Sequence, residues 1–279
     1  MKHGFTLAEV LITLGIIGVV AALSAPSLVQ NASSAQVGPK LAKAISTFET
    51  ANENLLQEAS ATRIANSGAT EGSGDDIQQN YIVNLSKYMK IAYLNEGEGS
   101  SKYASMIKNY NGSAIKNPGD NSSNSNSSSS GGLFDKGNMM GNIVNKFDFV
   151  GLKSDEAVKH LGLTKDGMLF AIALNTTPTG VANNLSVLDK DGNVISSGDV
   201  SPAHQTQYGT VLIDVNGKAK PNRIGKDVFL FRMMEDGTLQ PYGAGGQWNT
   251  GTDKCNASEV TTGNTCGASI LENDRKVIY

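Results

Sequence analysis

Near its start the chain reads GFTLAEV (residues 4–10), and a long apolar run follows. The segment 5–25 is long enough for a transmembrane helix, because about 20 apolar residues span a bilayer. Glu9 is the one carboxylate in this segment, and a charged side chain at bilayer depth is costly. The charge on Glu9 therefore needs compensation. A cut after Gly4 would make Phe5 a new N-terminus, and its amine would lie close to the Glu9 carboxylate.

Two other kinds of N-terminal segment have to be compared with this interpretation. An ordinary secretory signal peptide has a basic region, an apolar core of about 7–15 residues and a small-residue cleavage site after that core. Here the basic part is only Lys2-His3, the apolar run is longer, and Ser24-Ala25 offers a weak site. A plain single-pass anchor fits the length of the run. Neither alternative gives a reason for Glu9.

The same residues resemble a known motif, the class III signal of type IV pilins and type II secretion pseudopilins. Gly4 matches the glycine of the cleavage site, Phe5 the methylated aromatic residue and Glu9 the glutamate of that motif. Gly18 and Pro26 match the helix glycine and the helix-kink proline. Several positions in register make the motif specific, although it covers only about the first tenth of the chain.

The resemblance implies a life cycle for the protein. The precursor is expected in the cytoplasmic membrane as a single-pass protein whose head is extracytoplasmic. Prepilin peptidase would cut after Gly4, and Phe5 would be methylated. Assembly, with the help of an inner-membrane platform, would stack the apolar helices of many subunits out of the membrane lipid. Glu9 would then neutralise the N-terminal amine of a neighbour in a filament located in the periplasm or at the cell surface.

Composition excludes several other functions. The net charge of −3 and the pI near 5.7 give no electrostatic footprint for nucleic acid. The three histidines, His3, His160 and His204, have neither nucleophile nor metal-ligand spacing. No phosphate-binding loop, zinc-protease motif or nucleophile elbow occurs. We therefore expect a structural protein without a cofactor and not an enzyme.

The helical pattern continues beyond the membrane-length run. Apolar residues recur at three- and four-residue spacing, which predicts one amphipathic helix from Phe5 to about Glu58. Pro26 is expected to bend this helix, and Gly38-Pro39 to bend it again or to break it. The apolar residues are Val37, Leu41, Ala44, Ile45, Phe48, Ala51 and Leu55. The predicted divisions are a leader at 1–4, a membrane or filament-core helix at 5–25, its amphipathic continuation at 26–60 and a globular head at 61–279.

Two further segments precede the predicted sheet. Helical spacing at Ile77, Tyr81, Leu85 and Met89 predicts a second helix over Ile77–Leu94. The segment Asn109–Gly132 is rich in Ser, Asn and Gly and can bury little apolar surface, so we expect an exposed, mobile loop. This loop is either a variable recognition surface or a passive insertion.

Short apolar runs separated by turn residues follow. The predicted strands are Met168–Leu174, Leu185–Leu188, Val194–Ile195, Thr210–Val215, Val228–Met233 and Thr238–Tyr242, with turns at Asp191-Gly192 and Asp236-Gly237. Such strands form an antiparallel sheet that can bury one face against the amphipathic helix. The predicted fold class is therefore α+β, with two layers, which agrees with the pilin-like architecture that the resemblance implies.

Cys255 and Cys266 are the only cysteines, and a polar loop separates them. An extracytoplasmic location permits a disulfide, and such a loop orders poorly without one. Two free thiols are the alternative. A zinc site would need further Cys or His ligands, which this region lacks.

An oxygen-rich segment lies between two predicted strands. Asp214, Asn216 and Asp227 could ligate Ca²⁺, which takes six to eight oxygen ligands, and related secretion pseudopilins bind calcium in their heads. The alternative is a plain turn, in which Asp and Asn side chains bond to their own loop backbone. The spacing does not match an EF-hand.

Taken together, these features predict a structural subunit of a type IV pilus or a type II secretion pseudopilus. Its partners would be other pilin or pseudopilin subunits, the peptidase, the assembly platform and membrane lipid. The competing interpretation is a membrane-anchored extracytoplasmic binding protein that does not polymerise. Isolation of long polymers would separate the two.

Overall fold

The computed structural model describes most of the long helix and the framework of the head. Gly4, Phe5, the Asp191-Gly192 turn and the three histidines lie outside the described residues, as does most of the expected loop. The described residues are 6–72, 76–95, 107–113, 161–180, 187–188, 194–195, 206–217, 219–244, 255 and 263–273.

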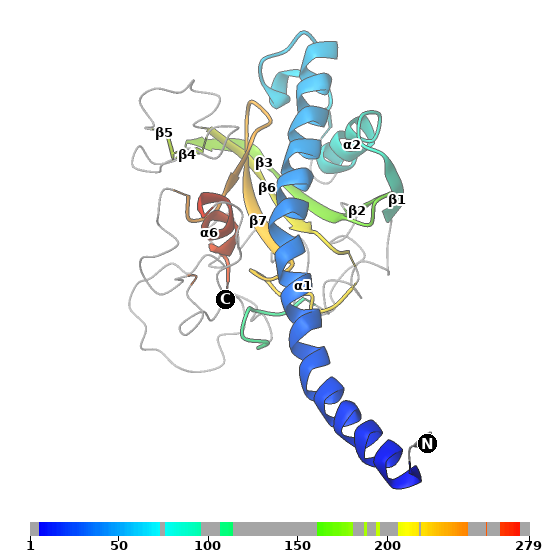
Figure 1. Ribbon diagram of the computed structural model, residues 1–279. Coiled ribbons are helices and arrows are strands. Elements are labelled where there is room, and N and C mark those ends of the chain that lie inside the picture. Colours follow the sequence, from blue (N-terminus) through cyan, green and yellow to red (C-terminus); the bar gives the residue numbers. More distant parts are fainter. Residues whose placement is uncertain are drawn as a thin grey trace, which may run out of the picture.

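A single long helix, α1 (Leu7–Glu58), dominates the molecule (Figure 1). Its 52 residues correspond to about 78 Å at 1.5 Å per residue. The helix was expected from Phe5 to about Glu58, and this prediction is confirmed to within two residues. It is unbroken at Gly38 and Pro39, so the break considered there is absent. Buried Val37 and Leu41 flank this point, and their packing holds the backbone helical despite the hydrogen bond that proline removes.

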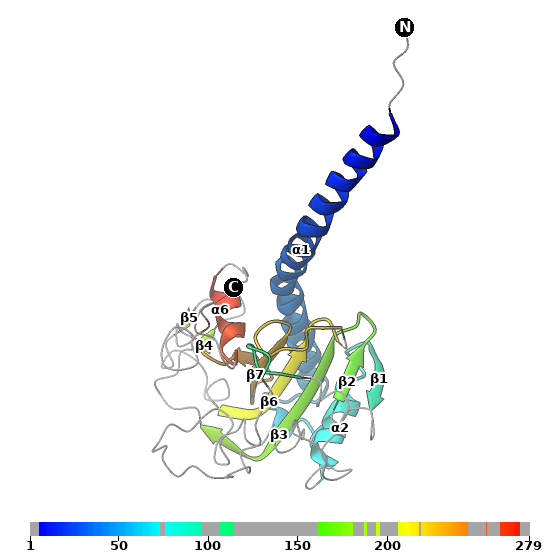
Figure 2. The same cartoon turned by 90° about the horizontal axis from the view of Figure 1, so that it is seen from below.

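The helix is not straight. Figure 1 shows its first part, in dark blue, leaving the axis of the part that lies on the head, and Figure 2 shows the same part projecting from the head. Pro26 lies between the membrane-length segment, which ends at Ser24, and Val37, the first residue of α1 whose side chain is described as buried. A proline inside a helix removes a hydrogen bond and bends the axis. The expected bend therefore has its cause within this interval.

The amphipathic stripe is buried as predicted. Phe48 is fully buried, and its ring meets that of Phe170 edge to face, with the centroids 6.0 Å apart. Ile45 is only partly buried at the edge of the core. The buried members of the stripe are Val37, Leu41, Ala44, Phe48, Ala51 and Leu55.

The second helix is shorter than predicted. Helix α2 (Asp76–Leu85) ends in tight turns, and Ile91–Asn95 forms strand β1. The prediction of helix as far as Leu94 was therefore wrong in its last part. The cause is non-local, because β1 pairs with a strand that lies about 70 residues further along the chain. Local spacing cannot report such a partner. Met89 still packs in the core, because hydrogen-bonded turns continue from the end of α2 to that residue.

The head contains a six-stranded antiparallel sheet in the order β1-β2-β3-β6-β7-β8. The other strands of this sheet are β2 (Leu161–Thr164), β3 (Leu169–Gly180), β6 (Thr206–Asp214), β7 (Val228–Met234) and β8 (Leu239–Pro241). A separate hairpin pairs β4 (Val187–Leu188) with β5 (Val194–Ile195). All six predicted strands are therefore found, Val194–Ile195 with the predicted bounds and the other five with shifted ends, whereas β1 and β2 were not predicted.

Helices cover one face of this sheet. Figure 1 shows α1 crossing it with α2 on one side and α6 (Cys266–Glu272) on the other, and both shorter helices contact α1. Ile213, Phe229 and Phe231 point from the sheet into this core. Side chains on the second face, such as Leu212, are buried too, so the sheet buries more than the single face expected. The α+β fold class is confirmed; α6 was not predicted.

A buried polar network ties α1 to α2 and to the turn between β7 and β8. The Tyr81 hydroxyl, on α2, donates to the Asn52 side-chain oxygen, and Asn52 Nδ2 donates to the Gly237 carbonyl at 2.6 Å. Burial raises the pKa of Tyr81, so the hydroxyl remains a donor. Gly237 has φ +85°, and an added Cβ would lie 2.7 Å from Asn52 Cβ. The predicted Asp236-Gly237 turn therefore requires its glycine for both reasons.

Phe48 anchors α1 on the sheet, so its loss should be costly. Phe48→Ala should lower the free energy of unfolding of the head by about 3–5 kcal/mol, because it removes a large buried side chain and leaves a cavity. Exposed Asn54→Ala, on the same helix, should change it by less than about 0.5 kcal/mol. Thermal melting of the full chain in detergent, followed by near-ultraviolet circular dichroism, measures both variants. Equal melting temperatures would contradict this role of Phe48.

Candidate functional site

The start of α1 is organised around Glu9. Thr6 caps the helix, and its backbone N–H and its hydroxyl each donate to Glu9 Oε2 at 2.8 Å. In return the Glu9 N–H donates to Thr6 Oγ1 at 3.3 Å. This is a capping box, in which two residues satisfy each other at a helix N-terminus. The positive end of the helix dipole also favours a carboxylate at this place.

This arrangement gives the carboxylate a partner within its own chain. Sequence reasoning identified Glu9 but missed Thr6, although the Thr-x-x-Glu spacing is the signal for a capping box. Of the three residues predicted for processing and assembly, the structure places only Glu9. Gly4 and Phe5 directly precede the described helix cap, so only Phe5 separates the predicted cleavage point from Thr6.

The apolar segment that follows is exposed throughout. Leu7–Ser24 is the one helical segment in the described part of the chain that is long and apolar enough to cross a membrane, and none of it is buried inside the protein. Leu7 and Leu23 are 79% and 76% exposed. A core helix of a soluble protein would be mostly covered. These side chains therefore need an environment outside the chain itself.

Two glycines in this segment have no role within the chain. A Cβ added to Gly15 or Gly18 would meet nothing within 4 Å. Glycine inside a helix is less favourable than alanine by about 0.5–1 kcal/mol. In membranes, small residues let helices approach closely. The glycines are therefore suited to contact with another helix and are not explained by the fold of this one.

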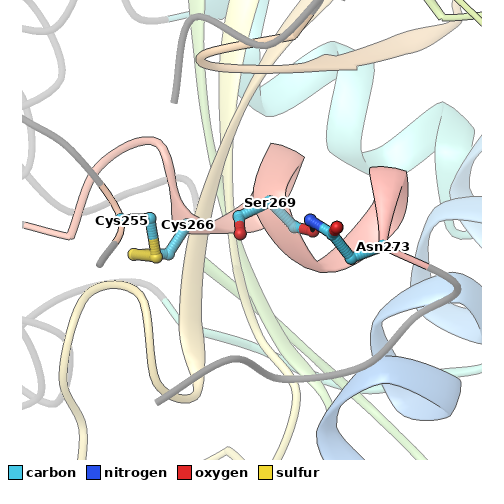
Figure 3. The surroundings of a disulfide bond; sticks show 4 residues. All are labelled: Cys255, Cys266, Ser269 and Asn273. Atoms are coloured by element: carbon cyan, nitrogen blue, oxygen red, sulfur yellow. Dashed lines mark hydrogen bonds between the residues drawn. A yellow bond between two sulfur atoms is a disulfide. The ribbon is translucent and has the colours of Figure 1, made fainter. Parts of the chain in front are cut away.

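At the far end of the chain the structure joins Cys255 and Cys266 in a disulfide with an S–S distance of 2.03 Å (Figure 3). Cys266 begins α6, so the bond fixes the start of this helix. Asn273 caps the end of α6, and its Nδ2 donates to the carbonyl of Ser269 on the helix. Both cysteines pack with Tyr110 in a small buried cluster.

Tyr110 belongs to a segment that was expected to be mobile. It is 8% exposed, and its neighbour Lys108 exchanges backbone hydrogen bonds with Asn222 and Ile224. Lys226 lies over the Tyr110 ring, 4.6 Å from the centroid. The expectation of an exposed loop from 109 onward was thus wrong at Tyr110, whose ring is buried, whereas Asn111 and Ser113 are exposed as expected. Residues 114–132 lie outside the described part.

Close backbone contact completes this cluster. A Cβ on Gly225 would lie 2.7 Å from the Gly263 carbonyl oxygen, and one on Gly263 would lie 2.3 Å from the Ile224 carbonyl oxygen. Both glycines have positive φ. Three segments distant in sequence therefore meet at the disulfide, and only glycine fits where two of them touch.

The oxygen-rich segment forms a single loop between β6 and β7. Asp227 Oδ1 accepts the Arg223 N–H at 2.6 Å, and its Oδ2 accepts the Asn222 N–H at 2.8 Å. Asn216 Nδ2 also donates to Asp227 Oδ2 at 3.2 Å, while the Asn216 N–H donates to Asp214 Oδ1 at 3.0 Å. Burial raises the pKa of Asp227, and the backbone donors partly offset this effect. These bonds are the ones expected of a turn.

The loop thus brings the three predicted oxygen ligands together. Asn216 Oδ1 is buried without a hydrogen-bond partner, whereas Asp227 already accepts three donors. Among the described residues, no group of three or more His, Cys, Asp or Glu side chains is placed to hold a metal ion. The turn is explained without an ion, and calcium at this loop stays a prediction.

Comparison with known proteins identifies the N-terminal segment. Residues 1–25 match the family model described as the prokaryotic N-terminal methylation motif. This motif is the signature of type IV pilins and pseudopilins, and the predicted resemblance is confirmed for this segment. Neither the curated proteins nor the solved structures contain a significant match to the chain.

The disulfide leads to a test in the cell envelope. Alkylation of the unreduced full chain should find no free thiol, and reduction should release two. Replacing both cysteines with serine should lower the free energy of unfolding by roughly 2–3 kcal/mol for a loop of this size. Free thiols in fresh unreduced protein, or a bond between chains, would contradict the pairing of Cys255 with Cys266.

The loop between β6 and β7 leads to a second test. Asp227→Ala should lower the free energy of unfolding by about 1.5–3 kcal/mol even in chelator, because buried donors lose a charged acceptor. Exposed Lys220→Ala, in the same loop, should change it by less than about 0.5 kcal/mol. The calcium hypothesis further predicts a higher melting temperature in millimolar calcium than in chelator, and loss of that shift in Asp214→Ala. An unchanged melting temperature would leave a plain turn.

Proposed function

We propose that this protein is a structural subunit of a type IV pilus or a type II secretion pseudopilus. The proposed precursor sits in the cytoplasmic membrane through α1, with its head outside. Prepilin peptidase cuts between Gly4 and Phe5, Phe5 is methylated, and the mature subunit joins a filament with other subunits at an inner-membrane platform. Proteins with this motif are structural subunits, and we assign no catalysis to this chain.

One observation at the start of α1 is the main support for this proposal. A membrane-length helix with no cover inside the chain begins at a carboxylate, and the pilin methylation motif covers this same segment. A lipid bilayer would satisfy the apolar side chains, but it would not favour Glu9. A filament core satisfies both, because neighbouring helices cover the apolar surface and a neighbour's N-terminal amine neutralises the carboxylate.

The capping box provides a partner for the Glu9 carboxylate while the subunit is still in the membrane. Before assembly, Thr6 holds the Glu9 carboxylate with two hydrogen bonds. Cleavage after Gly4 creates an amine one residue before Thr6. That amine carries a full positive charge, so it adds a Coulombic attraction to the Glu9 carboxylate that the neutral donors of Thr6 lack, and this attraction is stronger in apolar surroundings than in water. A charged amine can therefore compete with Thr6 for the same carboxylate once subunits meet.

The head serves as the outward-facing part of the proposed filament. The stripe from Val37 to Leu55 fixes α1 to the sheet, so the head travels with the helix. The competing interpretation is an anchored binding protein that never polymerises. It shares the membrane helix and the head, and it differs in giving Glu9, Gly15 and Gly18 no partner helix.

Processing is tested by mass spectrometry of the mature protein. The terminus should be N-methylated Phe5. Gly4→Val should leave the precursor uncut, because a branched side chain would fill a tight cleavage site. Ala25→Val, a matched change at the weak ordinary site, should leave processing unchanged. A mature terminus after Ala25 would overturn the proposal in favour of an ordinary signal peptide.

Assembly is tested by separating the charge of Glu9 from its capping role. Glu9→Gln keeps an oxygen that can accept from Thr6 but removes the charge. It should lower the yield of sheared filaments about tenfold or more. A loss of about 1.4 kcal/mol of pairing free energy between Glu9 and the neighbour's amine corresponds to a factor of ten. Thr6→Val removes the hydroxyl and keeps the charge, and it should still assemble. Equal amounts of membrane-inserted protein in all variants provide the control. Normal filament yield in Glu9→Gln would remove the charge-pairing argument.

A further inference from the structure

Two grooves of opposite charge lie along α1. The first has a volume of about 340 Å³ and lies between the helix, the turn after β2 and the loop after β6. Lys40 and Lys43 line it from the helix, and Asp166 lines it from the turn. Lys43 pairs with Asp166 at 2.6 Å, which leaves Lys40 as the excess charge. Exposed Lys165 and Lys220 adjoin lining residues in the chain, so this rim is basic.

The second groove is acidic. It has a volume of about 590 Å³ and lies between α1 and the turn that joins β7 to β8. Glu49, Glu53 and Asp236 line it, and the lining residues that the structure describes include neither lysine nor arginine. Arg63 is near in sequence, but its guanidinium pairs with the buried carboxylate of Glu235 at 2.9 Å. The described lining of this groove is therefore net negative.

The two grooves differ in height and in direction. From Lys43 to Glu53 the helix rises by about 15 Å, at 1.5 Å per residue. At 3.6 residues per turn, the basic and acidic residues lie roughly a third of a turn apart around the axis, on the two flanks of the exposed face. The strands of the sheet give the same placement of the two grooves, because β3 begins and β6 ends beside the basic groove. The turn from β7 to β8 lies at the opposite end of the strands.

This placement selects the kind of contact that two copies could make. A two-fold dimer needs one surface that is complementary to itself. Here the complementary surfaces lie on different flanks and at different heights, so the contact would be heterologous. Repetition of a heterologous contact that does not close gives an open helical array. The charge pattern of this chain therefore fits a stack of parallel copies, each raised along the helix axis relative to the next.

We propose that the basic groove around Lys40 and Lys43 docks on the acidic groove around Glu49 and Glu53 of a second copy of this chain. The inference rests on the proposed filament function and names the contact between heads within it. When two copies lie at equal depth in a membrane, the basic groove of one copy and the acidic groove of the other are at different heights. The contact therefore forms only when one copy is lifted by about 15 Å relative to its neighbour, as in a filament.

Cysteine cross-linking in the full chain tests the contact. Lys40→Cys and Glu53→Cys combined in one chain should give a ladder of disulfide-linked oligomers from sheared filaments, because each subunit presents both sites. Each single variant should give no ladder. Val83→Cys with Glu53→Cys is the matched control, since Val83 is exposed on α2, away from both grooves. Filaments that lack the ladder, or an equal ladder from the membrane pool, would overturn the proposal.

Charge reversal gives an independent readout. Lys40→Glu and Glu53→Lys should each lower filament yield several-fold, because each places like charges in contact. The chain that carries both reversals should recover most of the yield, since complementarity returns with opposite sign. Normal yield in both single variants, or no recovery in the double variant, overturns the proposal.

Head folding and membrane insertion should be unchanged, because both side chains are exposed. If the unsubstituted chain forms no polymer, the proposed function itself fails. If it forms polymers that ignore these charges, only this contact fails.

Discussion

The packing of the amphipathic stripe of α1 on the sheet is the interaction on which the rest of the structure depends. One continuous helix has to face two environments. From Leu7 to Ser24 its apolar side chains have no cover within the chain, whereas from Val37 to Leu55 they form the centre of the core. The helix transmits the position of the membrane segment to the head only because this second part is fixed. Phe48, Asn52 and the α2 and α6 contacts supply that attachment on three sides.

Charge is distributed along this helix in a way that complements the apolar packing. Glu9 is the only charged residue between positions 4 and 39, so electrostatic contacts in the lower half are confined to one place. Above that interval, lysines and glutamates return on two flanks of the exposed face. Apolar contact between helices is non-directional and sets no register of its own. Charged groups at fixed heights can supply that register, at the N-terminus through Glu9 and at the head through the two grooves.

The local parts of this fold could be predicted from the sequence, and the non-local parts could not. The stripe of α1 and the strands around Asp236-Gly237 follow from periodicity and turn residues that lie close together. The prediction for strand β1 was wrong because its partner, β2, follows a long intervening segment. The prediction for Tyr110 was wrong because its neighbours in the fold are Cys255 and Cys266. At the candidate site, Glu9 was evident as a lone charge. Its partner Thr6 was not predicted, although the Thr-x-x-Glu spacing of a capping box lies in the same residues.

Cleavage next to a capping box has a consequence for the timing of assembly. While the leader is present, position 5 carries an amide and not an amine, so the best partner within reach of Glu9 is Thr6. Removal of the leader on the proposed pathway adds a positive charge without changing the rest of the helix. Before processing, the Glu9 carboxylate can therefore bond to Thr6 of its own chain. After processing, it can bond instead to the N-terminal amine of a neighbouring chain. A hydroxyl at position 6 suits this change of partner better than a lysine would, because a neutral donor bonds to Glu9 without the Coulombic attraction that a fixed positive charge in the same chain would add.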